Sequence, residues 1–190
     1  MPKVTTASFK NGLTIELSGE LYTITDFQHV KPGKGGAFVR TKLKAIVSGK
    51  VLDKTFRAGE SVEAVRVERQ AYQYLYHDGE LYHFMHQETY EQVMVTAAQV
   101  NNPELLKESE IVTITVNADT EKILFTELPA QVTLEVKQTD PGLKGDTAQG
   151  GTKPATLESG AVIQVPLFIN EGDQVRVDTR TSGYLERVKV

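Results

Sequence analysis

The strongest constraint in this sequence is a repeated alternation of apolar and polar residues in short runs. The runs Leu13–Leu17 and Ala37–Val47 alternate with a period of two, which places their apolar residues on one face of a strand. Glycine-containing turns at Ser18–Glu20 and Ser48–Lys50 separate these runs from the next ones. Because similar runs recur to the end of the chain, the sequence predicts an all-β fold.

Changes in the pattern divide the 190 residues into three β units. Residues 1–64 form a meander of about five strands, the size of a small closed barrel. Residues 65–128 contain a strong hairpin signal at Asp78-Gly79, and residues 129–190 contain further alternating runs. Units of about sixty residues lie near the lower limit of independent stability, so packing between them is expected to contribute.

Two segments interrupt the strand pattern. Thr96–Ser109 is expected to begin with one helical turn, which residues 101–103 should break because residue 103 is proline. Thr139–Gly160 is expected to form a long glycine-rich loop, in which Lys144 and Lys153 suit phosphate groups. A loop of this length is typical either of a functional segment or of a disordered one.

Charge is distributed unevenly along the chain. The formal net charge is -4, but residues 1–64 hold ten basic and six acidic residues, whereas residues 65–128 hold four and eleven. Between Lys31 and Arg57 eight residues are basic and only Asp53 is acidic. A basic module on an acidic chain can bind a phosphate backbone at one end. A solvated lysine-rich face explains the same charges equally well.

A glycine-rich turn, KPGKGG at Lys31–Gly36, carries Lys34 at its tip. In the strand that follows, Arg40, Lys42 and Lys44 share one face as a basic stripe, and the opposite face can pack a core. A nucleotide-binding P-loop is excluded, because that loop needs a helix after its lysine and a strand follows here.

The sequence contains no arrangement of residues typical of an enzyme. It has no cysteine and no G-x-S-x-G sequence, which excludes thiol catalysis and the common serine-hydrolase elbow. His83 and His86 lie on opposite faces of one predicted strand, so they cannot share a metal without a bend. A Schiff-base enzyme would use Lys34 as its amine, but the glycine neighbours supply no apolar surround. We therefore expect no catalytic residue, no metal and no cofactor.

Tyr72, Tyr74 and Tyr76 occupy one face of a predicted strand. Aromatic strand faces can stack nucleobases. This segment is acidic, so we expect the three rings to pack a core or a domain interface instead.

Neither a membrane span nor an export signal is predicted. No apolar run approaches the ~18 residues that a spanning helix needs, and the N-terminal residues lack the apolar stretch of a signal peptide. We expect a cytoplasmic monomer without a membrane partner.

Three segments together resemble the bacterial elongation factor P family. They are KPGKGGAFVRTKL after the first hairpin, YQYLYHDGELYHFMHQETYEQ in the second unit, and GDTAQGGTKPATLESGAVIQVPLFINEGDQVRVDTRTSGY in the third. The third segment contains the family pattern K-x-A-x4-G-x2-[LIV]-x-V-P-x2-[LIV]-x2-G, filled by Lys153, Ala155, Gly160, Ile163, Val165, Pro166, Ile169 and Gly172. The segments cover nearly the whole chain in the right order.

The resemblance implies three small β-barrel domains in an L-shaped, tRNA-like arrangement. An SH3/KOW-like barrel would span residues 1–64, and two OB-fold barrels would span residues 65–128 and 129–190. The implied function is that of a translation elongation factor, not an enzyme, which binds the ribosome between the P and E sites beside P-site peptidyl-tRNA. There it would promote peptide-bond formation and relieve stalls at consecutive prolines. The alternative is a general single-stranded nucleic-acid-binding OB protein, which the negative net charge disfavours.

The resemblance also implies roles for individual residues. Lys34 matches the functional tip that points toward the acceptor end of the tRNA. In part of the family an enzyme extends this lysine, and in other members it is bare or replaced by a modified arginine, so the state of Lys34 stays open. The rest of the tip loop comprises Lys31, Pro32, Gly33, Gly35 and Gly36.

Two further sites are implied in the last unit. Gly145, Asp146 and Thr147 match a segment placed near E-site mRNA on the small subunit, so both ribosomal subunits are expected partners. Tyr184 and Arg187 match the family's C-terminal residues for tRNA or rRNA contact. The chain reads RTSGY where many relatives read R-T-G-x-Y, which shifts the glycine within this turn.

Overall fold

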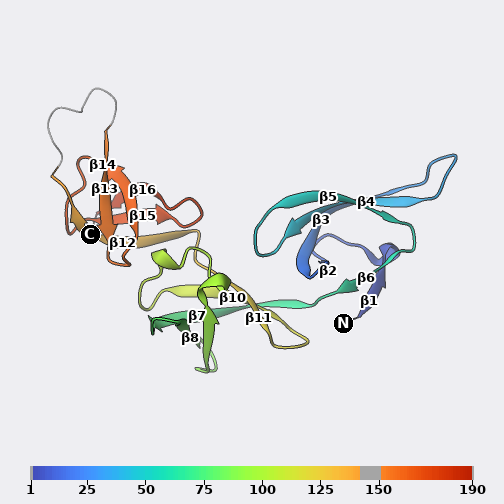
Figure 1. Cartoon of the computed structure of the whole chain (residues 1–190), viewed down its shortest axis with the longest axis horizontal. Coiled ribbons are helices and arrows are strands. Elements are labelled where there is room, and N and C mark those ends of the chain that lie inside the picture. The colour runs from blue at the N-terminus through green and yellow to red at the C-terminus, as the bar shows by residue number, and fades with distance from the viewer. Residues whose placement is uncertain (1, 142–150, 190) are drawn as a thin grey trace. The chain divides into compact units, whose positions relative to one another are not determined.

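The computed structural model describes residues 2–141 and 151–189, and its regular structure is almost entirely β (Figure 1). The strands are β1 Lys3–Thr5, β2 Thr14–Leu17, β3 Glu20–Val30, β4 Phe38–Ala45, β5 Val51–Arg57, β6 Ser61–Ala64, β7 Val67–His77, β8 Leu81–His86, β9 Gln92–Thr96, β10 Ile111–Asn117, β11 Ile123–Glu127, β12 Gln131–Thr139, β13 Thr152–Leu157, β14 Val162–Pro166, β15 Gln174–Asp178 and β16 Gly183–Val188. Short 3-10 helices are η1 Thr6–Ser8, η2 Ala97–Gln99 and η3 Pro103–Leu105. The predicted all-β class is confirmed.

The strands form three sheets. Their strand orders are β1-β6-β2-β3-β4-β5, β11-β10-β7-β8-β9 and β14-β13-β12-β15-β16. By compactness the chain divides into two units, one with the residues up to 69 and 115–124, the other with 70–114 and 125–190. Among the described residues, no helix combines the length and apolar character that a membrane crossing requires.

The first sheet packs its inward face around an apolar core. Val39 and Leu43 of β4 are fully buried, and Phe9 meets Phe56 edge-on with ring centroids 5.3 Å apart. Each such side chain contributes roughly 1.5–3 kcal/mol by leaving water. The inward face of β4 is therefore fixed, as its period-two pattern predicts.

The β7–β8 hairpin turns at Asp78-Gly79 as predicted, but one tyrosine is placed differently. Tyr72 and Tyr74 are buried, whereas Tyr76 is 48% exposed. A β-bulge between Tyr74 and Tyr76 shifts the register, so that Tyr74 pairs with Phe84 and Tyr76 pairs with His83. The prediction that all three tyrosines share one face is wrong for Tyr76, because the extra residue reverses the alternation.

The turn of this hairpin is held by the Asp78 carboxylate. It accepts hydrogen bonds from the backbone N–H groups of Leu81 and Glu80 at 2.8 and 2.9 Å, and its second oxygen lies 2.7 Å from His83 Nε2. The Leu81 N–H, followed by the His83 and Glu80 contacts, holds the pKa of Asp78 well below its ordinary value.

The third sheet contains a strand that was predicted to be loop. β13 lies between β12 and β14, and Lys153, Ala155 and Leu157 face inward. Pro154 argues against a strand in the sequence, because proline lacks the backbone N–H that donates a hydrogen bond to a neighbouring strand. The structure tolerates it because the pairing of β12 with β13 ends at Thr139 and Ala155, so no β12 partner lies opposite Pro154. The predicted loop from 139 to 160 is therefore wrong for residues 152–157.

The interrupting segment forms η2 and η3, which confirms the predicted helical turn and its break. Leu105 of η3 is fully buried within the core cluster of the third sheet, next to residues such as Leu134 and Val177. Lys107 Nζ donates to the Thr133 carbonyl at 2.6 Å. A side chain from between β9 and β10 thus completes the core around β12.

Replacing Leu105 by alanine tests this anchoring. The cavity left in the core should lower the free energy of unfolding by about 2–5 kcal/mol. Urea denaturation measures the loss, and amide exchange in β12 and β15 should accelerate. The exposed neighbour gives the control, since Glu104→Ala should change stability by no more than about 0.5 kcal/mol. Accelerated exchange confined to β8 and β9 would contradict this role of Leu105.

Replacing Asp78 by asparagine tests the carboxylate turn. Because the pKa of Asp78 is lowered in the folded chain, the ionised form stabilises the fold above the ordinary carboxyl pKa of about 4. That contribution is lost as pH falls below this value. Thermal melting should show a lower Tm for Asp78→Asn at neutral pH, with the difference shrinking below about pH 4. Glu80→Gln controls for charge, and a pH-independent difference for Asp78→Asn would refute the linkage.

Candidate functional site

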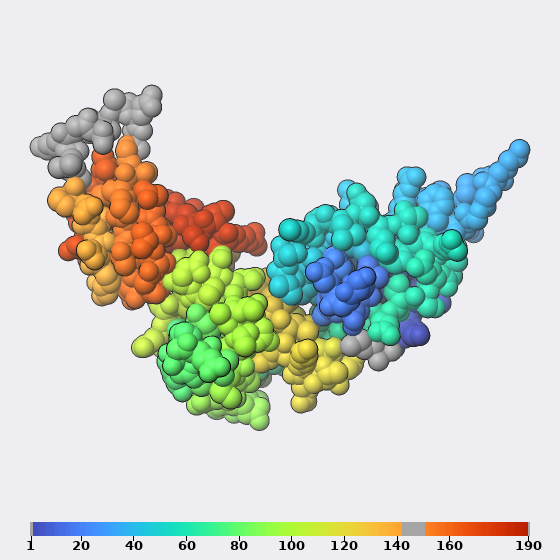
Figure 2. All heavy atoms as spheres, viewed as in Figure 1, coloured from blue at the N-terminus to red at the C-terminus, as the bar shows by residue number. Residues whose placement is uncertain are grey.

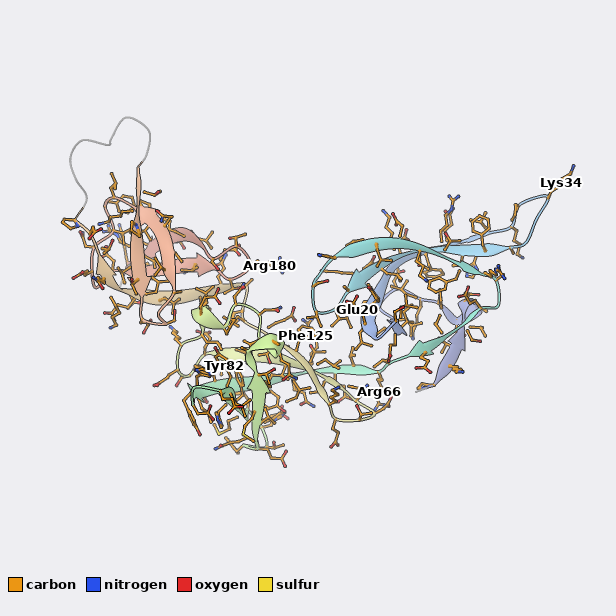
Figure 3. All side chains as sticks on the ribbon, in the orientation of Figure 1. Glu20, Lys34, Arg66, Tyr82, Phe125 and Arg180 are labelled. Atoms are coloured by element: carbon orange, nitrogen blue, oxygen red, sulfur yellow. The ribbon has the colours of Figure 1, made fainter. Side chains whose placement is uncertain are left out.

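Strands β3 and β4 hold the glycine-rich turn at the end of the first sheet. The last pair of the ladder joins Val30 to Phe38, and the Ala37 carbonyl accepts a hydrogen bond from the Ala58 N–H at 3.0 Å. Residues 31–36 beyond that pair are exposed. Figure 3 shows Lys34 at the far end of the turn, with its side chain directed away from the sheet. Its ammonium has no hydrogen-bond or ion-pair partner among the described residues. Strand β4 follows the turn, as predicted, so no helix is present there to complete a P-loop.

The turn is narrow because three of its residues lack side chains. Figure 2 shows it as a thin light-blue projection from the body of the first sheet. Gly35 has a φ of +114°, a conformation that other residues rarely adopt. The φ angles at positions 33 and 36 do not require glycine, and a Cβ at either position would meet no atom within 4 Å. The fold around them would accept larger side chains.

The predicted basic stripe lies on the outward face of β4. Arg40, Lys42 and Lys44 are exposed, while Thr41 and Leu43 between them are buried. The geometric part of that prediction is therefore confirmed, and the stripe is presented by a strand whose other face is fixed in the core.

Cross-strand neighbours change the charge along this stripe. The pairing partners of Lys42 are Asp26 on β3 and Asp53 on β5, and both are exposed. Directly opposite residues in a sheet have Cβ atoms about 4.5–5.5 Å apart. The central row of the stripe thus holds two carboxylates and one ammonium. The sequence does not predict Asp26 as a neighbour of Lys42, because a bulge between Ile24 and Asp26 sets the register.

The end of the sheet nearest the turn is basic without acidic neighbours in the ladder. Arg40 lies between Gln28 and Thr55, and Arg57 lies opposite Phe38 on the same outward face. The Arg40 guanidinium lies 5.5 Å from the centroid of the Phe38 ring. Arg57 is not among the site residues predicted from the sequence. The sequence feature that could have identified Arg57 is the β4–β5 hairpin, because its register places residue 57 beside residue 38.

The β16 residues of the third sheet have mixed environments. Tyr184 is half-buried and packs against the core cluster, whereas Arg187 is exposed. The Arg187 guanidinium carbon lies 5.7 Å from the ring centroid of Phe168, and its Nη1 atom is 3.7 Å from Asp173. Arg187 is therefore exposed at the surface with a carboxylate beside it, and Tyr184 is only partly exposed.

The remaining predicted residues do not form a described site. Gly145, Asp146 and Thr147 lie outside the described residues. The prediction that Lys153 suits a phosphate is wrong, because Lys153 is buried and its Nζ donates to the Asp140 carbonyl at 2.5 Å.

The histidines of the second sheet make contacts within its strands and turns. His83 bonds to Asp78, and His86 Nδ1 accepts the backbone N–H groups of Glu88 and Thr89 at 3.1 Å. Within residues 2–141 and 151–189, no group of three or more His, Asp or Glu side chains is placed to hold a metal ion.

Comparison with known proteins covers nearly the whole chain. The matching family models are the elongation factor P (EF-P) KOW-like domain at residues 5–62, the elongation factor P (EF-P) OB domain at residues 67–123, and elongation factor P, C-terminal, at residues 132–187. A solved structure of a translation initiation factor eif-5a family protein from Naegleria fowleri covers 67% of this chain and 98% of its own, with a TM-score of 0.51. At 18% identity this likeness concerns the fold alone.

Curated relatives match at much higher identity. Elongation factor P of Salinibacter ruber is 58% identical over 183 residues, which cover 96% of this chain and 95% of the relative. Elongation factor P of Azobacteroides pseudotrichonymphae is 54% identical over 185 residues, which cover 97% and 99%. With all three domain models matched in order, the chain belongs to the elongation factor P family.

Proposed function

We propose that this translation elongation factor binds the ribosome between the P and E sites, beside the peptidyl-tRNA of the P site. There it promotes peptide-bond formation when translation stalls at consecutive prolines. The observation that carries this proposal is the exposed Lys34, which has no hydrogen-bond or ion-pair partner in residues 2–141 and 151–189, at the end of a turn whose glycines leave it narrow. A tip of this shape can enter a cavity lined by RNA and bring one cation to the acceptor end of the tRNA.

The chemistry in this proposal belongs to the ribosome, and the factor acts by positioning. Proline aligns poorly as the attacking amine, and its fixed φ limits how a nascent chain that ends in proline can align, so orientation contributes much of the barrier. The Lys34 ammonium is a compact charge on a flexible stem that suits contact with phosphate. Steadying the tRNA end would lower the entropic part of the barrier. Covalent extension of Lys34 by a modifying enzyme would let this side chain extend further toward the tRNA end.

Other parts of the chain would hold the factor in place. The outward face of β4, on which Arg40, Lys42 and Lys44 are exposed, would face RNA, with Arg40 in contact with it. Arg187, with its guanidinium at the surface beside Phe168, would contact tRNA or rRNA. The segment Gly145–Thr147 would lie near E-site mRNA on the small subunit. Residues 65–128, with eleven acidic and four basic residues, would stay away from phosphate.

Replacing Lys34 by alanine tests the tip. Lys34 makes no contact with the described fold, so the Tm should not change, but rescue of a proline-run reporter in cell-free translation should be lost. Lys50→Ala is the matched control, because it removes one exposed lysine from the turn at the other end of β4. Full rescue by Lys34→Ala would exclude the role given to Lys34. Tight filter binding of the wild-type chain to free oligonucleotides would favour the general nucleic-acid binder instead.

Replacing Gly36 by leucine tests the need for a narrow turn. A Cβ at Gly36 meets open space, so the free energy of unfolding should change by no more than about 0.5 kcal/mol. Rescue of the same reporter should nevertheless fall, because the added bulk obstructs entry of the turn into a confined cavity. The variant keeps Lys34, which separates the shape of the turn from its charge. Undiminished rescue would show that the width of the turn is irrelevant.

A further inference from the structure

The row structure of the first sheet distinguishes its cations from one another. We propose that Arg57 and Arg40 hold phosphate groups of an RNA backbone at the base of the Lys34 turn, and that Lys42 does not. This inference rests on the proposed ribosomal function and assigns the RNA contact to particular residues. It adds Arg57 to the site and removes the central lysine of the stripe from it.

The charge differs between the outward-facing rows of residues that run across β3, β4 and β5. Next to the turn, the row Val30–Phe38–Arg57 carries one positive charge, and the following row, Gln28–Arg40–Thr55, carries another. These are the two outward-facing rows nearest Lys34, separated by the core-facing row of Val39, and they contain no carboxylate.

The row behind them reverses the sign. Asp26 and Asp53 flank Lys42 directly on both sides, so this row has a net charge of -1. A phosphate approaching Lys42 would also approach the two carboxylates beside it, and like charges repel. The attraction of Lys42 for RNA is therefore largely cancelled where it is exposed.

The two arginines lie close to each other on the outward face of the sheet. Arg40 and Arg57 are diagonal neighbours on adjacent strands, for which Cβ atoms lie about 7–8 Å apart. Both side chains are long and exposed, so they can reach separate phosphates of one backbone. Arg40 lies over the Phe38 ring, which restricts its guanidinium, while the Arg57 side chain has no hydrogen-bond or ion-pair partner among the described residues.

Glu60 lies near Arg57 but contacts its backbone, and among the described residues no ion pair joins the Glu60 carboxylate to the Arg57 guanidinium. The Glu60 carboxylate accepts a hydrogen bond from the backbone N–H of Arg57 at 2.8 Å. This bond fixes the end of β5 and survives substitution of the Arg57 side chain. An Arg57→Ala variant should therefore retain the local fold and lose only the cation.

RNA phosphate is the ligand that fits this patch best. Arginine forks bind phosphate oxygens with two N–H donors, and two cations whose ladder rows contain no carboxylate attract a polyanion. Each phosphate contact releases counterions, so it contributes about 0.7–0.9 to the slope of log K against log salt. That slope separates a phosphate contact from a purely structural role.

The test titrates the full chain onto purified ribosomes carrying P-site tRNA, at several salt concentrations. Arg57→Ala and Arg40→Ala should each weaken binding about fivefold or more and reduce the salt slope by about one. Lys42→Ala is the matched control, because it removes one cation from the same face of β4. It should change affinity by less than about twofold and leave the slope unchanged.

A double-mutant cycle tests the neutralisation itself. Replacing Asp26 and Asp53 together by asparagine should tighten binding to the ribosome. On that background Lys42→Ala should weaken binding, by the same factor as Arg57→Ala weakens binding of the wild-type chain. An additive cycle, with Lys42→Ala neutral on both backgrounds, would refute the effect assigned to the carboxylates.

The remaining outcomes are also decisive. Equal losses for Lys42→Ala and Arg57→Ala in the wild type would overturn this inference while leaving ribosome binding intact. Weaker binding of Arg57→Ala with an unchanged salt slope would overturn the phosphate contact. Absence of wild-type binding would overturn the proposed function, and this inference with it.

Discussion

The burial of one face of β4 is the constraint on which the presentation of the whole site depends. Val39 and Leu43 are fully buried, so the alternate side chains of the strand must face solvent. Ladders to β3 and β5 on either side hold β4 in register. A glycine-rich turn could not by itself fix the position of Lys34, but it projects from the end of a strand that is anchored over its whole length.

The same ladders decide which charges act together. In the sequence, the segment from Lys31 to Arg57 has eight basic residues and one acidic residue, which describes a uniformly basic module. In the sheet, Asp26 from outside that segment joins Asp53 beside Lys42. Local charge is therefore a property of rows across strands, and the outward-facing rows next to the turn keep their positive charge, whereas the row of Lys42 does not.

Patterns that depend on near neighbours were predictable, and those that depend on register or on distant packing were not. Alternation alone indicated the two faces of β4, and Asp78-Gly79 alone indicated the β7–β8 turn. The outward position of Tyr76 depends on a bulge, for which the sequence has no glycine signal. Strand β13 was missed because Pro154 is tolerated only where the pairing with β12 ends. The neighbours of Lys42 and the burial of Leu105 arise from segments that meet only after folding.

Leu105 has a consequence for how this chain can be divided. A fragment that starts at the sequence-derived boundary of residue 129 would contain every strand of the third sheet but would lack a fully buried member of its core. It would also lack Asn102, whose side-chain amide donates to the Thr179 carbonyl, and Lys107, which bonds to Thr133. A fragment meant to fold on its own should therefore begin upstream of Asn102, even though the strands themselves begin thirty residues later, at Gln131. The smallest autonomous piece of the C-terminal half is thus larger than its sheet.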